Sequence, residues 1–237
     1  TSMNSLFWHT PFNQPIGGWD VSNVTDMSGV FSWTPFNQDI SSWDVGNVNT
    51  MNMLFNSTPF NQDISSWDVS NVTNTQEMFR MSSFNYDISN WDVSNITDMN
   101  QMFRLSPFNH DISNWDVGNV WNMRWLFEGS AFNQNIGSWD ISSASDMFNI
   151  FSNSQMSTSN YDYTLTGWAQ QNVLNNVNLS ASGIHFCNED SRQYLINNFN
   201  WNIIDAGLDP TCIASFDDPP IISSYGNEMY CPQTQQN

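Results

Sequence analysis

Lysine is absent from this sequence, and its only basic residues are four arginines, set against 23 Asp and Glu. The formal net charge of −19 argues against nucleic-acid binding, because phosphates are neutralised by clusters of Lys and Arg. No stretch approaches the roughly 18 apolar residues of a membrane-spanning helix, and no positively charged signal segment opens the chain. The aromatic content of 15% is nevertheless too high for a disordered acidic chain. The composition therefore predicts a soluble, acidic, ordered protein or a piece of one.

Cysteine is also scarce. Cys187, Cys212 and Cys231 all lie in the last third of the chain, and because three is an odd number, at most one intramolecular disulfide can form. There is no C-x-x-C pair and no Cys/His cluster at metal-ligand spacing, which argues against a structural zinc site. The cysteines fit an oxidising, extracellular setting better than the cytosol.

What the sequence has in excess is a repeat with a fixed period of 24 residues. The unit reads P-F-N-Q-D-I-S-S-W-D-V-S-N-V-T-D-M-x-x-M-F, with a Phe at its second position and one Trp-Asp pair in every copy. The recurring residues are Phe12, Phe36, Phe60, Phe84, Phe108 and Phe132, and Trp19, Trp43, Trp67, Trp91, Trp115 and Trp139. A short fixed period without insertions is typical of a solenoid, in which each coil stacks on the next.

Within one coil, the apolar positions predict a short strand followed by a turn of helix. Trp43, Asp44 and Val45 alternate between apolar and polar, which is the strand period, and over residues 47–55 the apolar residues are three and four apart, as on one face of a helix. We therefore predict an α/β repeat solenoid of leucine-rich-repeat-like, right-handed coils. Each coil is expected to contain one short parallel strand and one helical turn, with strands of neighbouring coils about 4.8 Å apart.

The repeat fades after Phe151, and the chain then changes character. Helical patterns cover residues 161–170 and 191–199, and strand patterns cover residues 183–187 and 201–204. The predicted organisation is a six-coil solenoid over 1–157, a small α+β C-terminal cap over 158–207, and a linker or the start of a further domain over 208–237, which is rich in Pro and Asp.

This organisation favours one disulfide. Cys187 ends a predicted strand of the cap and Cys212 follows the closing strand, so we expect these two to pair and Cys231 to remain for another partner. Pairing of Cys212 with Cys231 is the alternative.

The repeat units also resemble those of a known family. The segments FNQDISSWDVSNV and WDVSNITDMNQMF look like the repeats of the BspA-like leucine-rich-repeat bacterial surface proteins, also called PARCEL repeats. The HFC, RQYLINNF and WNIIDAG stretches are similar to the closing module that follows such repeats. The resemblance implies a secreted or surface-anchored solenoid that serves adhesion and protein interaction, without catalytic residues.

Stacking of the coils should bring the Trp-Asp carboxylates into a row. At about 4.8 Å spacing, each neighbouring pair repels by roughly 3–4 kcal/mol at an effective dielectric constant of 20. One interpretation is that the row binds divalent cations, calcium above all, and the other is that each carboxylate accepts backbone N–H bonds or is simply hydrated. The row comprises Asp20, Asp44, Asp68, Asp92, Asp116 and Asp140, with a second row of Asp39, Asp63, Asp87 and Asp111 beside it. The asparagines at 47, 71, 95 and 119 are expected to form a ladder that bonds to backbone turns.

Departures from the repeat are the best candidates for a binding site, since stacking does not require them. Trp121 and Trp125 fill columns that are mostly polar in the other coils, and Arg124 lies between them. Arg80 and Arg104 share a column one coil apart. We expect both indoles to face solvent on one side of a helical turn, as part of a partner-binding surface of aromatic and arginine side chains. Local packing of the tryptophans is the alternative interpretation.

No nucleophile elbow, phosphate loop or metal motif is present, so catalysis is not expected. The sequence favours an extracellular, adhesin-like interaction module, secreted or on the cell surface, that binds a host or neighbouring-cell protein or glycan through the solenoid. The alternative is a structural spacer or filament subunit that stacks end to end with copies of itself. A binder of ice or crystal surfaces is disfavoured because there is no flat Thr-x-Thr array.

Overall fold

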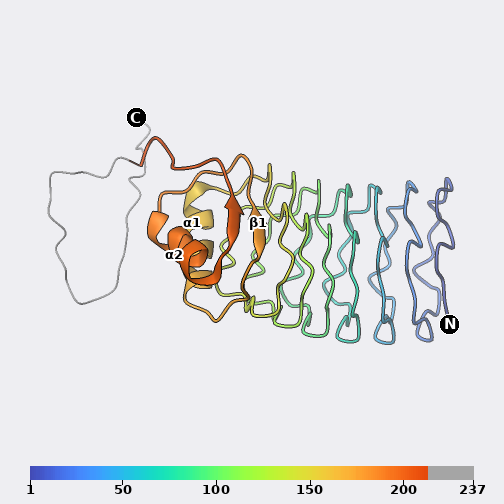
Figure 1. Ribbon diagram of the computed structural model, residues 1–237. Helices are drawn as coiled ribbons and strands as arrows, with labels where there is room; N and C mark the ends of the chain where they lie inside the picture. Colours follow the sequence, from blue (N-terminus) through green and yellow to red (C-terminus); the bar gives the residue numbers. More distant parts are fainter. Residues whose placement is uncertain (213–237) are drawn as a thin grey trace, which may run out of the picture.

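The computed structural model describes residues 1–212, and in it the chain winds as a stack of coils (Figure 1). Isolated parallel bridges join equivalent residues of successive coils, namely Ser2, Asp26, Thr50, Asn74, Asp98, Asn122 and Asp146. One residue before each bridge, the backbone of every coil bonds to the coil before it: the N–H of Asn49 donates to Thr25 at 2.8 Å and the N–H of Thr73 to Asn49 at 2.9 Å. The 24-residue period of the sequence is thus the length of one coil.

The strand and the helical turn expected in each coil are not found. Trp43 and Val45 are buried and Asp44 is exposed, as predicted, but these residues form no strand. Residues 52–57 form turns instead of a helix, because Met53 and Ser57 have φ angles of 57° and 56°. A helix needs consecutive right-handed residues, so a left-handed residue at every fourth position prevents one.

The turns explain the misleading spacing of apolar residues. Alternate N–H groups, those of Met51, Met53 and Phe55, donate to carbonyls of the next coil at 2.8–3.0 Å, and the N–H of Leu54 returns to Met51 within the coil at 3.1 Å. Hydrogen bonds between residues three apart turn the chain so that every third or fourth side chain points into the core of the stack. A helix would produce the same spacing of apolar residues. The same pair of left-handed positions recurs in the other coils.

The core consists of aromatic columns that run along the stack. Phe31, Phe55, Phe79, Phe103, Phe127 and Phe151 form one column of stacked rings, with centroids 5.7–6.1 Å apart. Beside it, the Trp-Asp indoles from Trp43 to Trp139 each donate to the backbone of the preceding coil, as Trp43 Nε1 does to the Ile16 carbonyl at 3.1 Å. Each ring is therefore buried and also has its one polar atom satisfied.

Side-chain amides form a second set of bonds between coils. Asn71 Nδ2 donates to the Gly46 carbonyl at 2.7 Å, and Asn47, Asn95 and Asn119 make the equivalent bonds. The asparagine ladder predicted from the sequence is confirmed.

Two helices and two strands follow the last coil: α1 (Thr158–Ala169), β1 (Asn178–Ser180), α2 (Glu189–Phe199) and β2 (Asn202–Ile204). The predictions of both helices and of the last strand are confirmed within a few residues. The strand predicted at 183–187 is wrong, because Gly183, with φ of 86°, lies in a turn and the strand precedes it. Within 183–187 only Phe186 forms a bridge, to Leu208.

The two strands extend the stack. β1 pairs in parallel with β2, and Leu179 also bridges to Met147 of the last coil. α1 packs on the same coil, where Gly167 touches Gly137 so closely that a Cβ at Gly167 would lie 2.2 Å from the Gly137 carbonyl oxygen. Cys187 and Cys212 are joined by a disulfide, with Cα atoms 5.7 Å apart. Cys231 and most of the predicted 208–237 segment lie outside the described residues.

Candidate interaction surface

Side chains that differ between coils gather on one face of the stack. The first half of each coil, from the Phe to the Asn-Val pair, is nearly constant, whereas the following segment varies. We call the side chains of six columns the variable face, defined by their members in the first coil: Thr25, Asp26, Ser28, Gly29, Ser32 and Trp33. Arg80, Arg104, Arg124, Trp121 and Trp125 all belong to these columns.

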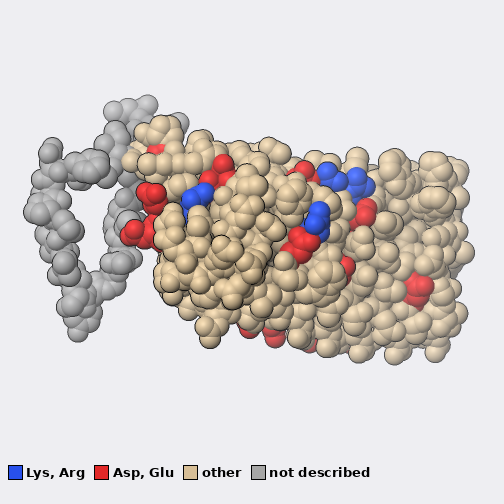
Figure 2. All heavy atoms as spheres, in the orientation of Figure 1, with Lys and Arg blue, Asp and Glu red and all other residues tan. Residues whose placement is uncertain are grey.

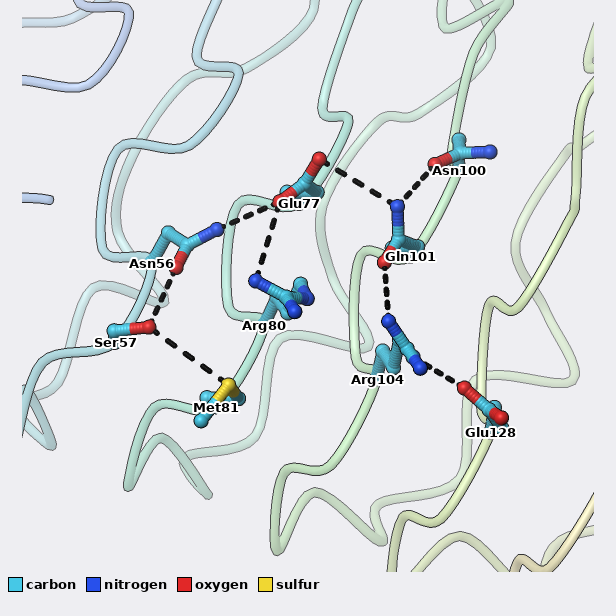
Figure 3. A network of polar contacts seen from close by, with 9 residues as sticks. All are labelled: Asn56, Ser57, Glu77, Arg80, Met81, Asn100, Gln101, Arg104 and Glu128. Atoms are coloured by element: carbon cyan, nitrogen blue, oxygen red, sulfur yellow. Dashed lines mark hydrogen bonds and ion pairs between the residues drawn. The ribbon is translucent and has the colours of Figure 1, made fainter.

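A polar network crosses several coils of the variable face (Figure 3). Asn56 Nδ2 donates to Glu77 Oε2 at 2.8 Å, and Gln101 Nε2 reaches the other carboxylate oxygen of Glu77 at 3.5 Å. Arg104 Nη1 donates to Gln101 Oε1 at 2.9 Å, while its Nε forms an ion pair with Glu128. The network therefore ties four successive coils together through side chains, from Asn56 to Glu128.

The arginines of this face are not free positive charges. Arg80 lies 3.6 Å from Glu77, and Arg124 lies 3.0 Å from Asp146. Each blue side chain in Figure 2 accordingly has red neighbours. The sequence analysis did not identify these carboxylate partners. Two of them could have been found, because Glu128 and Asp146 follow their arginines by about one coil length. The arginines therefore neutralise carboxylates of this face and offer no net charge to an anion.

Trp125 packs locally. Its ring lies 4.4 Å from the guanidinium of Arg124 and 5.9 Å from that of Arg104, and the ring of Phe148 meets it edge-on at 5.9 Å. These cation–π contacts hold the half-buried indole between coils. The expectation that both indoles face solvent from one helical turn is wrong for Trp125, because the segment is not a helix and Trp125 is left-handed, with φ of 52°.

Trp121 differs from Trp125, since its side chain is 49% exposed. Its backbone belongs to the ladder between coils: its N–H donates to Thr97 and its carbonyl accepts from Ser145, both at 3.1 Å. The fold thus holds the Trp121 backbone firmly and leaves the indole open to solvent.

Of the five residues predicted to form one binding surface, the structure brings together three: Arg104, Arg124 and Trp125. Trp121 is separate from this group, and Arg80 forms an ion pair with Glu77.

The two aspartate rows are held by their own turns. In the first row each carboxylate accepts the N–H two residues later, as Asp68 does from Ser70 at 3.0 Å and Asp140 from Ser142 at 2.9 Å. The second row does the same, as Asp87 does with Ser89 at 2.9 Å. Hydrogen bonds from the side chain and backbone of Ser70 lower the pKa of Asp68, and those from Ser89 lower the pKa of Asp87. Within residues 1–212, no group of three or more His, Cys, Asp or Glu is placed to hold a metal ion.

A comparison with family models identifies the chain's relatives. The model described as "Mycoplasma protein of unknown function, DUF285" matches residues 1–106 and 80–194. The chain belongs to this family. The overlapping matches fit a repeat protein, in which the model can be placed at more than one register. No curated protein and no solved structure matches the chain, and in the part that the structure describes no helix is long and apolar enough to cross a membrane.

Proposed function

We propose that this chain is an extracellular, adhesin-like interaction module of a bacterial surface, which binds a protein or glycan partner through the variable face. The observation that carries the proposal is Trp121: a rigid ladder backbone presents a large indole that is 49% exposed, in a column that holds Thr, Asn or Ser in the other coils. Exposed aromatic side chains on a fixed scaffold are characteristic of binding surfaces.

The resemblance to BspA-like leucine-rich-repeat surface proteins supports the same proposal. Solenoids of this class present a long face whose side chains can vary without disturbing the stacked core. Here the varying residues lie on turns or at the bridges between coils that precede them, and the constant residues form the Phe, Trp and Asn columns inside and between coils. A constant core with a varying surface suits a scaffold that binds its partner through that surface.

The alternative of end-to-end filaments has less support. A filament of identical subunits requires the last coil to meet the first coil of the next copy. Trp168 of α1 instead bonds to Ile136 at 3.1 Å and stacks on Phe151 at 6.0 Å, so α1 occupies the end of the aromatic columns. Head-to-tail stacking would have to displace this helix.

The two tryptophans give the test, because their environments differ. Trp121→Thr introduces the residue found at positions 25, 73 and 97 and should change the free energy of unfolding by no more than about 0.5 kcal/mol. Binding of the labelled protein to cultured epithelial cells and to a glycan array should be lost in this variant. Trp125→Gln, which breaks the contacts with Arg104 and Arg124, should destabilise the protein by about 1–2 kcal/mol.

The two variants distinguish recognition from packing. Loss of binding with normal melting in Trp121→Thr supports the proposal. Normal binding in that variant, or a drop in its stability as large as that of Trp125→Gln, would refute the assignment of Trp121 to recognition.

A further inference from the structure

The last part of the cap repeats the coil geometry of the stack, with α2 lying beyond β1 at the C-terminal end (Figure 1). Asn176 and Asn200 are 24 residues apart, and both are left-handed, with φ of 61° and 54°. Trp201 Nε1 donates to the Leu174 carbonyl at 2.8 Å, across the same 27 residues as the indole bonds of the stack. Residues 188–212, which we call the terminal unit, therefore form one more coil.

Few apolar contacts hold the terminal unit in place. Its helix α2 buries one side chain completely, that of Leu195, whereas α1 buries four, including that of Trp168. Of the three residues of β2, only Ile203 is buried. Each coil of a solenoid is stabilised by its neighbours, so an end coil with little buried apolar surface opens more readily than the rest.

The charges in this region oppose the closed arrangement. Residues 158–212 contain five Asp and Glu but a single basic residue that is charged at neutral pH, Arg192. Asp162 of α1 accepts the N–H of Cys187 at 3.0 Å, and burial raises its pKa, to which the Asp209 carboxylate of the terminal unit adds. Movement of the terminal unit away from α1 would relieve this repulsion.

A covalent bond holds the unit against these charges. Cys212, at the end of the unit, is joined by a disulfide to Cys187, 25 residues earlier. Next to the disulfide, Phe186 bridges to Leu208, and the N–H of Asp209 donates to the Phe186 carbonyl at 2.8 Å. The cross-link favours this pairing, because it reduces the conformational freedom that the chain would gain on opening.

From this geometry we propose that the Cys187–Cys212 disulfide is a redox switch: it keeps the terminal unit closed, and its reduction by a dithiol opens the unit while the stack stays folded. The step is a thiol–disulfide exchange. Two electrons and two protons pass from the dithiol to the cysteine pair, so that the S–S bond breaks, two cysteine thiols form, and the reductant becomes a disulfide.

Opening would uncover an edge of the parallel ladder. In the closed unit, the N–H of Ala181 donates to the Ile204 carbonyl at 2.7 Å, and this donor is released when the unit moves away. An uncovered strand edge can pair with another chain. The inference goes beyond the proposed function, because it concerns the cap and does not involve the variable face.

Trypsin provides the test, because the chain has no lysine and its four arginines are divided between the two parts. Arg192 lies in α2, whereas Arg80, Arg104 and Arg124 lie in the stack. The protein is digested with and without dithiothreitol, and the fragments are separated on a denaturing gel. Cleavage after Arg192 should become about a hundredfold faster on reduction, as expected for loss of a cross-link that closes a loop of this length. The three sites in the stack should stay uncut, which is the internal control for folding.

Three variants sharpen the test. Cys187→Ser combined with Cys212→Ser should be cut after Arg192 without reductant, as fast as the reduced protein. In Asp162→Asn the reduced protein should be cut more slowly, because a charge that favours opening is removed. Arg192→Gln is the control for the cleavage site and should not yield the early fragment.

The inference is overturned if reduction does not accelerate cleavage after Arg192, or if the double serine variant resists trypsin like the oxidised protein. Cleavage of the stack sites as fast as Arg192 would also overturn it, because the disulfide would then control the whole fold and not one unit. Equal cleavage of reduced Asp162→Asn and the reduced original protein would refute the opposing role of Asp162.

Discussion

Arg80 and Arg104 occupy the same column in adjacent coils, yet the two guanidinium groups are used differently. Arg104 contacts Glu128, Gln101 and the ring of Trp125. Arg80 contacts Glu77, and its Nε is buried without a hydrogen-bond partner among the described residues. A buried donor that is left unsatisfied lowers stability by about 1–3 kcal/mol. Two arginines at equivalent positions therefore contribute differently to the stability of the fold.

This difference predicts that substitution by lysine will affect stability differently at the two positions. Arg80→Lys replaces Nε by a methylene group and keeps a positive charge for Glu77, so the free energy of unfolding should stay within about 0.5 kcal/mol or rise. Arg104→Lys gives up the forked geometry that reaches Gln101 and Glu128 together and should lower the free energy by about 1–2 kcal/mol. Urea unfolding of both variants is the measurement, and an equal loss in the two would contradict this account.

At the scale of elements, α1 continues the stack although it is not a coil. Trp168 donates to Ile136 as Trp139 donates to Ile112. Its ring lies 6.0 Å from that of Phe151, as the ring of Trp139 lies 6.3 Å from that of Phe127, so Trp168 continues the tryptophan column. Ser157 is the N-cap of the helix, and its side chain accepts the N–H of Asn160. This cap fixes the position of the first turn. A helix can therefore close an aromatic column if a single tryptophan is placed correctly.

Replacement of this indole should affect stability like replacement inside the stack. Trp168→Phe keeps a stacking ring but leaves the Ile136 carbonyl unpaired, which should lower the free energy of unfolding by about 1–3 kcal/mol. Trp139→Phe should have a similar effect through Ile112. Trp19→Phe is the control, because Trp19 is 45% exposed and should change stability by about 0.5 kcal/mol or less. A Trp168 variant as stable as the Trp19 variant would show that α1 does not close the column.

The repeat made much of this architecture predictable, and particular residues show where prediction failed. The period placed Trp139 and the asparagine ladder correctly, since identical residues in stacked coils must meet. The left-handed turns at Met53 and Ser57 were missed, although other coils carry Gly29 and Asn149 in the first of these columns and Gly129 and Asn153 in the second. Glycine and asparagine favour that conformation, so they were the available signal. The role of Trp168 was hidden because it follows Trp139 by 29 residues and not by one period. The environment of Trp125 depended on Phe148 in the next coil, whose position follows only from the turn geometry.

At the scale of the whole molecule, the negative charge is arranged in rows whose carboxylates are each bonded to their own turn. Hydrogen bonds from the following serines lower the pKa of Asp20, Asp39, Asp68, Asp87 and Asp140. Asp162 of α1 is the exception: burial raises its pKa even though it accepts the N–H of Cys187 at 3.0 Å. Carboxylates of the stack and of α1 therefore respond to acid in opposite directions.

These opposite shifts predict the acid response. A carboxyl group whose pKa is lower in the folded protein than in the unfolded chain stabilises the fold above the unfolded value, and this contribution is lost as the pH falls through the folded value. The carboxylate of Asp162, with a raised pKa, weakens the fold at neutral pH, and protonation removes that penalty. The free energy of unfolding, measured in urea at low ionic strength from about pH 7 to pH 2, should fall less in Asp68→Asn than in the original protein and more in Asp162→Asn. Identical pH profiles for all three proteins would show that these two carboxylates do not contribute to the acid response. A reversed order would show that the pKa shifts of Asp68 and Asp162 have the opposite sign.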